Sequence, residues 1–186
     1  EEEFKGSGVS YCATCDGNFF KGKDVCVVGG GNTAVADAIY LSRICNKVTV
    51  IVRRDVLRAT AIYNVKLKEL DNVEIIWNTT VEEIVGEDFA VTGLKLKNVN
   101  TGEESTIACS ALFVAIGTVP NVEFLDNAVE LDRTGHVVTN SVGETSVPGV
   151  YAAGDIRSKE LYQITTAVAD GANAAEDVAQ YLIQHE

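Results

Sequence analysis

The sequence contains no methionine, two prolines, two histidines and one tryptophan among its 186 residues. It is also poor in positive charge, because 15 lysines and arginines stand against 27 acidic residues for a net charge of -12. A nucleic-acid or anionic-membrane surface needs clustered Lys and Arg, so this balance argues against both partners. No apolar run approaches the roughly 20 residues of a membrane span. The start, EEEFKGSG, lacks the basic front and apolar centre of a signal peptide.

These absences predict a cytoplasmic globular protein that binds neither membranes nor nucleic acid. The absence of methionine and the acidic start further suggest a piece of a longer chain. Hydrophobic residues make up 46% of the sequence and charged residues 23%, which is enough to build a buried core.

Strand-like and helix-like segments alternate in the first part of the chain, which predicts βαβ units and a parallel sheet. Residues 90–117 then show strand-like alternation and an Asn-Thr-Gly turn, which predict an antiparallel excursion that returns to the sheet at 111–117. The expected strands are residues 23–31, 47–53 and 73–78, and the expected helices are residues 32–45 and 58–70.

The stretch TVPN at residues 118–121 contains one of the two prolines and predicts a domain boundary. Beyond it we expect a polar loop at 131–140, a strand at 149–155 and a long helix from about Gln163. The fold class expected is α/β, a Rossmann-like parallel sheet with an antiparallel β excursion, followed by a partial second α/β domain.

The segment VVGGGNTA fits Gly-x-Gly-x-x-Ala, with Gly29, Gly31 and Ala34 at the fixed positions. The first glycine permits a tight turn, the second lets backbone N–H groups approach a pyrophosphate, and the small third residue allows close packing of helix and strand. A purely structural turn is the alternative. We predict a nucleotide site formed by Gly29, Gly30, Gly31, Asn32, Thr33 and Ala34.

An NAD site places Asp or Glu about 20 residues further on, to bind the ribose 2′-hydroxyl. Here Val52 is followed by Arg53, Arg54 and Arg58. A guanidinium forms charge-assisted bonds to phosphate of roughly 1.5–3 kcal/mol each. The cluster therefore predicts the 2′-phosphate of NADP(H), although a solvated basic patch, or pairing of Asp55 with one arginine, would explain it otherwise.

Cys12 and Cys15 form a Cys-x-x-Cys pair that could be a metal clamp, a structural disulfide or a redox pair. A tetrahedral zinc site needs four ligands, and the other cysteines are isolated while both histidines lie far along the chain, so no metal is expected. Cys26, Cys45 and Cys109 are most simply core residues.

The redox interpretation requires a lowered thiol pKa, which a helix beginning at or near Cys15 would favour. Asp16 could act as a general acid or base, or it could be an ordinary carboxylate at a helix N-terminus. NADPH delivers a hydride whereas a disulfide is reduced by nucleophilic attack, so a flavin is the expected intermediary.

The motifs CATCDG, GGGNTA, RRDVLRA, LFVAIGTVPN and GVYAAGD, in this order, closely resemble the low-molecular-weight thioredoxin reductases of bacteria. The resemblance covers essentially the whole chain. It implies an NADPH-binding domain with the Cys-x-x-Cys pair at residues 1–118 and the C-terminal part of an FAD-binding domain at residues 119–186. The family's N-terminal FAD segment is not present, so this chain alone is expected to bind NADP(H) without a full FAD site.

The resemblance also implies roles for single residues. Electrons would pass from NADPH to FAD, then to the Cys12–Cys15 disulfide and then to thioredoxin, as part of cell redox homeostasis. Cys15 would face the flavin, Cys12 would attack the thioredoxin disulfide, and Asp16 would transfer protons. The remaining cofactor residues implied are Gly117, Asp155 for the FAD ribityl chain, and Ile156, Gln163 and Ile164 at the flavin end. Hinges are expected near residues 5–8 and 117–121, and the intact enzyme is expected to be a homodimer.

Two positions depart from the family pattern: Val52 stands where His is frequent, and Tyr162 stands where Arg commonly precedes the glutamine. Two other functions stay open. One is a related NADPH-dependent flavoprotein that serves a peroxidase or another dithiol carrier, and the other is a non-catalytic NADP(H)-binding module. Without the rest of an FAD domain, we expect Val150, Ala152 and the helix from Gln163 to expose apolar surface.

Overall fold

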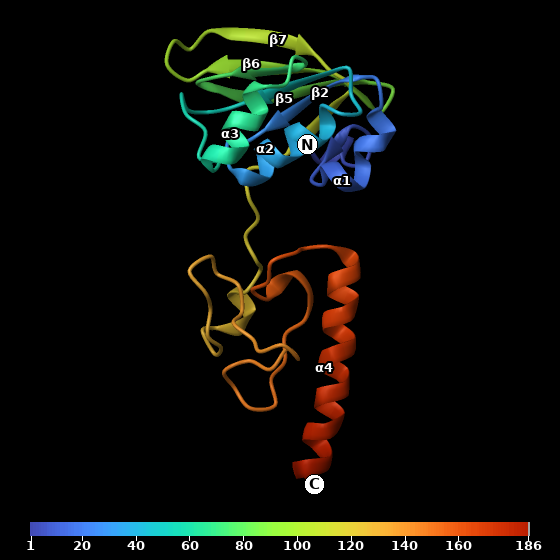
Figure 1. Cartoon of the computed structure of the whole chain (residues 1–186), viewed down its shortest axis with the longest axis vertical. Coiled ribbons are helices and arrows are strands. Elements are labelled where there is room, and N and C mark those ends of the chain that lie inside the picture. Colours follow the sequence, from blue (N-terminus) through green and yellow to red (C-terminus); the bar gives the residue numbers. More distant parts are fainter. Residues whose placement is uncertain (186) are drawn as a thin grey trace. The chain divides into compact units, whose positions relative to one another are not determined.

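A computed structural model of the chain describes residues 1–185 and separates into two compact units. The first unit comprises residues 1–117, and the second begins at Thr118. This division falls next to the boundary expected after residue 118, while the assignment of NADPH and FAD to the two units stays a prediction. Figure 1 shows the first unit with its sheets and the second with its long helix.

The first unit is built on a parallel sheet whose neighbouring strands all run in the same direction. β2 pairs with β3 from Asp24–Lys47 to Val28–Ile51, so the two strands end at the same edge of the sheet. The strands lie in the order β1 (Val9–Ser10), β8 (Ala111–Val114), β2 (Asp24–Val28), β3 (Lys47–Ile51) and β4 (Val73–Ile76).

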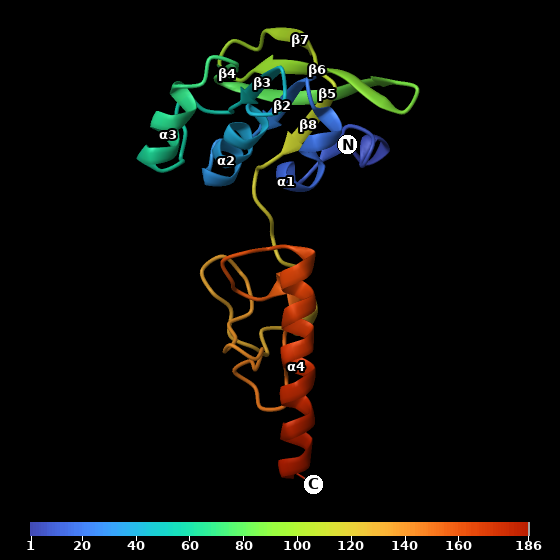
Figure 2. The ribbon, with the colours of Figure 1, turned by 45° about the vertical axis from the view of Figure 1, so that its right-hand side comes forward.

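Helices cover one face of this sheet (Figures 1 and 2). Val27, Val48 and Val50 are fully buried against them, because strands of a covered parallel sheet carry apolar residues. The helical segments on this face are α1 (Ala13–Asp16), η2 (Gly17–Phe20), α2 (Asn32–Leu41) and α3 (Ala61–Lys68), whereas Phe4 of η1 (Glu2–Phe4) packs in the core of the opposite face.

Two of these helices are shorter than the sequence pattern predicted. The helix expected over residues 32–45 ends at Leu41, and Ser42 Oγ donates to the Ile39 carbonyl within its last turn. The helix expected over residues 58–70 begins only at Ala61, because residues 53–60 form a loop after β3. The apolar periodicity continued beyond the hydrogen-bonded segment in both cases.

A separate antiparallel sheet covers the opposite face of the parallel sheet (Figure 2). Leu94 and Leu96 pack between the two sheets with Ile51 and Leu112. The strands of the antiparallel sheet are β5 (Thr79–Glu87), β6 (Ala90–Asn98) and β7 (Glu104–Ala108). This combination confirms the expected fold class, a parallel sheet with an antiparallel excursion. The sequence analysis missed β5 and began the excursion at Ala90, and it also missed β1 of the parallel sheet.

As far as residue 185, the second unit consists of loops held by isolated bridges, two single-turn helices and one long helix. The strand expected at 149–155 is wrong, because within the described residues Tyr151 makes only one bridge, to Glu144, and Gly154 starts a 3₁₀ turn. The helices are η3 (Glu123–Leu125), η4 (Gly154–Ile156) and α4 (Ile164–His185). Over residues 1–185, no helix has both the length and the apolar character needed to cross a membrane.

Candidate functional site

Cys12 and Cys15 form a disulfide across the first turn after β1, with their Cα atoms 5.3 Å apart. The helix begins at Ala13, two residues before Cys15, so Cys12 is its N-cap and the Cys12 sulfur accepts the Cys15 N–H at 3.2 Å. Cys15 is exposed and Cys12 is half-buried. The first turn of α1 therefore directs one backbone N–H at the Cys12 sulfur.

Asp16 lies at the end of the same short helix and is held by Ser10 of β1. Ser10 Oγ donates to Asp16 Oδ2 at 2.7 Å and accepts the Cys12 N–H at 3.1 Å. One hydroxyl therefore fixes both the carboxylate and the backbone of the first cysteine. The sequence analysis did not identify Ser10, because this contact requires the strand to be followed by a turn that folds back on it.

The glycine segment lies where β2 ends and α2 begins. Gly29 has a φ of +146°, and a Cβ there would collide with the carbonyl oxygen of Ala115. At Gly30 a Cβ would come within 3.1 Å of Val52. At Gly31 a Cβ would meet nothing within 4 Å, so this last glycine borders open space at the α2 N-terminus.

Of the first three residues of α2, two lie at the surface and one packs against the sheet. Asn32 and Thr33 are exposed, whereas Ala34 is fully buried close to Gly29. The first N–H groups of a helix have no intrahelical partner and carry the positive end of its dipole. A small residue at position 34 lets this end approach the sheet, which is the arrangement that suits a phosphate.

The three arginines that follow β3 are exposed, while Val52 before them is buried. Arg53, Arg54 and Arg58 line a pocket of about 830 Å³, and Gly29 and Gly30 line the same pocket. The parallel pairing of β2 with β3 explains this meeting, because both segments leave the sheet at one edge. Within residues 1–185, no ion pair joins Asp55 to these arginines, which leaves their charge available to a ligand.

The cofactor residues expected beyond β8 are distributed as follows. Gly117 ends the first unit with a φ of +108°. In the second unit, Asp155 and Ile156 form η4 and line a pocket of about 360 Å³. Gln163 directly precedes α4, and Ile164, which is 83% exposed, is the first residue of α4. Neither residue lines the pocket of Asp155 and Ile156.

Tyr162, where the family commonly has Arg, also lines the smaller pocket. Its ring lies 5.4 Å from the ring of His136, and Lys159 Nζ lies 5.6 Å from its centroid. A positive charge is therefore still present beside this position, supplied by Lys159.

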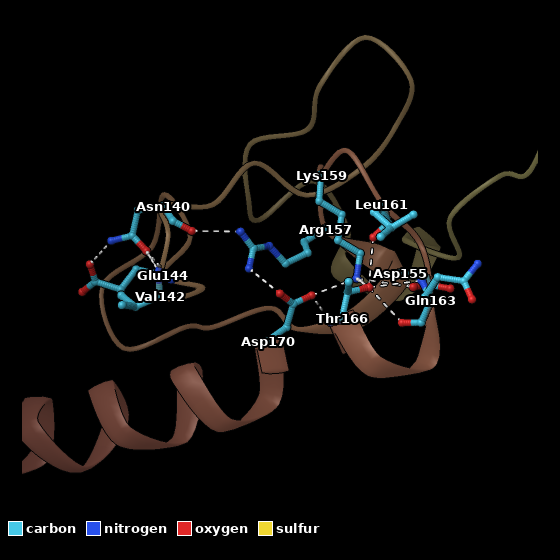
Figure 3. A network of polar contacts seen from close by, with 11 residues as sticks. Asn140, Val142, Glu144, Asp155, Arg157, Lys159, Leu161, Gln163, Thr166 and Asp170 are labelled. Atoms are coloured by element: carbon cyan, nitrogen blue, oxygen red, sulfur yellow. Dashed lines mark hydrogen bonds and ion pairs between the residues drawn. The ribbon is translucent and has the colours of Figure 1, made fainter. Parts of the chain in front are cut away.

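A network of partly buried charges supports the η4 turn (Figure 3). Asp170 of α4 accepts from Arg157 Nη1 at 2.9 Å, from Lys159 Nζ at 2.9 Å and from the Gly154 N–H at 3.1 Å. Lys159 also lies 3.5 Å from Asp155. Burial by itself would raise the pKa of Asp170, but the Lys159 hydrogen bond and the Arg157 charge lower it overall. The carboxylate therefore stays ionised and ties the turn to the helix.

The other cysteines are buried, with Cys26 1% exposed, Cys109 5% and Cys45 7%. A hydrogen bond with Cys109, together with burial, raises the pKa of the Cys26 thiol, which therefore stays protonated. Among the described residues, no three His, Cys, Asp or Glu side chains are grouped in a way that could hold a metal ion.

Comparison with known proteins places this geometry in a family. The model of the pyridine nucleotide-disulphide oxidoreductases matches residues 1–171. Thioredoxin reductase of Treponema pallidum is 47% identical over 182 residues, covering 98% of this chain and 59% of that protein. Thioredoxin reductase of Listeria monocytogenes is 45% identical over 182 residues, covering 98% of this chain and 57% of that protein.

Among solved structures, thioredoxin reductase from Streptococcus pyogenes aligns with a TM-score of 0.91 and 43% identity, covering 98% of this chain and 60% of that one. The chain thus spans somewhat less than two thirds of the length of these relatives. With a disulfide and a glycine turn in one compact unit, and a family model that matches nearly all of its length, the chain belongs to the pyridine nucleotide-disulphide oxidoreductases.

Proposed function

We propose that this chain forms the NADP(H)-binding and dithiol part of a thioredoxin-disulfide reductase, together with the C-terminal part of its FAD-binding domain. The observation that carries the proposal is the shared pocket: the glycine turn and three arginines open onto one cavity in the unit that holds the Cys12–Cys15 disulfide. The similarity to thioredoxin reductases over 98% of the chain supports the choice of thioredoxin as the partner.

The residues of the larger pocket fit NADPH. Gly29 and Gly30 line it with Arg53, Arg54 and Arg58, whose guanidinium groups suit the 2′-phosphate. Gly31 does not line this pocket, but it borders open space at the α2 N-terminus, where a pyrophosphate would bind. NADPH, when bound, supplies the hydride from which the reducing equivalents come. In the second unit, Asp155 and Ile156 border a pocket and, with Gln163 and Ile164, are the residues proposed to contact FAD.

The reduced dithiol performs the exchange with thioredoxin. The Cys12 thiolate attacks one sulfur of the thioredoxin disulfide, the disulfide breaks, and a mixed disulfide forms while the departing thioredoxin sulfur takes up a proton. The Cys15 thiolate then attacks the Cys12 sulfur, which releases the second thioredoxin thiol and restores the Cys12–Cys15 disulfide. Asp16, held by Ser10, is the proposed proton carrier for these thiols. We further propose that the intact enzyme is a homodimer.

The experiment uses the full-length parent with the change Cys12→Ser. We expect it to abolish reduction of thioredoxin by NADPH while reduction of the bound flavin by NADPH continues. Cys45→Ser is the matched control, because Cys45 is buried and its sulfur donates only to the Phe20 carbonyl, a bond that a hydroxyl can keep. Thioredoxin reduction that persists in Cys12→Ser, with Cys45→Ser equally active, would contradict the proposed function.

A further inference from the structure

The loop that carries the three arginines is tied to the glycine turn. Arg53, Arg54 and Arg58 are themselves exposed, so the position of their guanidinium groups depends on where the loop backbone is held. Leu57 and Ala59, which flank Arg58 in the sequence and are 9% and 8% exposed, anchor the loop in the core. Burial of these two side chains holds the loop against the core. Hydrogen bonds from the loop backbone then hold it beside the glycine turn.

Two hydrogen bonds from the loop backbone run to the nucleotide turn. The Arg58 N–H donates to the Gly30 carbonyl at 2.7 Å, and the Thr60 N–H donates to Asn32 Oδ1 at 2.8 Å. Asn32 is the first residue of α2, and Thr60 is the N-cap of α3. One amide side chain therefore joins the N-termini of two helices that lie 28 residues apart in sequence.

An asparagine suits this position for two physical reasons. Its Oδ1 accepts the Thr60 N–H without adding a negative charge beside bound phosphates, which an aspartate would do. Its bond is made before any ligand arrives, so the loop does not have to be ordered at the moment of binding. Ordering a loop residue weakens binding, and preorganisation removes that penalty.

We infer that Asn32 is a positioning residue for the 2′-phosphate, and that its bond to Thr60 strengthens the preference of this chain for NADP(H) over NAD(H) by holding the arginine loop in place. This inference rests on the proposed nucleotide site. Asn32 acts through the loop: when its bond is lost, Arg58 and its neighbours are held by the Gly30 bond and by core packing alone. The pyrophosphate-binding turn keeps its glycines, so binding of NAD⁺ changes much less than binding of NADP⁺.

The test is calorimetric titration of this chain with NADP⁺ and with NAD⁺. Asn32→Ala removes the acceptor, and Thr60→Pro removes the donor at a residue whose φ of -62° already suits proline. We expect each variant to lower the ratio of NADP⁺ to NAD⁺ affinity about fivefold, or about 1 kcal/mol, the net contribution of one hydrogen bond. The double variant should show no further loss, because both changes break the same bond.

Asn46→Ala is the matched control. Asn46 also makes an exposed side-chain bond, to Asp24 at 2.6 Å, but it lies where β3 begins, at the opposite edge of the sheet. This variant should keep the wild-type affinity ratio. Thermal unfolding will establish whether each variant is folded. If Thr60→Pro fails to fold, Asn32→Ala alone decides the question.

The outcomes separate this inference from the proposed function. If Asn32→Ala weakens NADP⁺ and NAD⁺ equally, or weakens neither, the ratio of the two affinities is unchanged. Either result would overturn the role of Asn32 while the NADPH assignment stands. A wild-type chain that binds both nucleotides equally would overturn both. A lower ratio in both variants, with a normal ratio in Asn46→Ala, supports the inference.

Discussion

At the residue scale, Arg53 and Arg54 provide a direct test of the phosphate assignment. Both are exposed and line the pocket of the glycine turn. Replacing both with Ala should weaken NADP⁺ binding at least tenfold, because each charge-assisted bond contributes about 1.5–3 kcal/mol. NAD⁺ lacks the 2′-phosphate and should lose little affinity. Titration with the two nucleotides measures the difference, and Arg43→Ala, an exposed arginine beyond the end of α2, is the control. Similar losses for both nucleotides would contradict the assignment.

Asp37, on α2, gives a pH-dependent prediction. Burial raises its pKa from 3.8 to about 6, so the folded state favours the protonated carboxyl. The stabilisation from this group is fully present below about pH 4 and is lost as the pH rises through about 6. Asp37→Asn should therefore stabilise the chain at a pH well above 6, by about 1–2 kcal/mol after allowance for solvent screening, and should change little near pH 4. Thermal unfolding at both pH values checks this, and a gain of equal size at both would refute it.

The meeting of Gly29 and Gly30 with the three arginines at one pocket was predictable from the sequence, while their roles in binding stay predictions. The glycines and the arginines follow one another along the chain, and strand order alone brings them to one sheet edge. Ser10 and Asn32 acquire their contacts from the tertiary fold: Ser10 bonds back from the strand to Asp16, and Asn32 reaches Thr60 at a distance of 28 residues. No periodicity or motif spacing encodes such a partner.

At the element scale, four strands of the parallel sheet, β2, β3, β4 and β8, were identified from the sequence, whereas the two-residue β1 and the irregular β5 were not. β5 has register shifts between Val81 and Glu83 and between Val85 and Gly86, so its side chains do not alternate with a period of two. The opposite error occurred at 149–155, where apolar residues suggested a strand. Gly149 and Gly154 there have φ values of +77° and +79°, and such turns interrupt an extended segment.

The junction of η4 with α4 depends on Asp170. Its side chain is 13% exposed and lies between the side chains of Arg157 and Lys159 (Figure 3). Asp170→Asn should destabilise the second unit by about 2–3 kcal/mol, because two partly buried cations lose their counter-charge. Thermal unfolding followed by circular dichroism measures the loss. Glu176→Gln, an exposed charge change on the same helix, should have little effect, and equal stabilities for the two variants would rule out this role for the network.

At the scale of the whole molecule, the two units differ in how much core they contain. The first unit has two extensive cores, one on each face of the parallel sheet. In the second unit the buried apolar residues are few, among them Val129, Val137 and Ala174. The expected exposure of apolar residues is present at Val150 and along α4, whereas Ala152 is half-buried.

The exposed apolar side chains of α4 lead to a prediction about association. Val168 is 67% exposed, Leu182 55% and Ile183 76%, although a stable monomer ordinarily buries the apolar stripe of a long helix. We expect the chain to self-associate as its concentration rises, with burial contributing about 25 cal/mol per Å² of apolar area. Sedimentation velocity over a concentration series measures this association.

The double change Val168→Lys with Ile183→Lys should shift the equilibrium toward monomer, since each lysine places a charge in the apolar contact. Gln180→Lys on the same helix should not shift it. A chain that stays monomeric at every concentration would show that this helix face does not drive association.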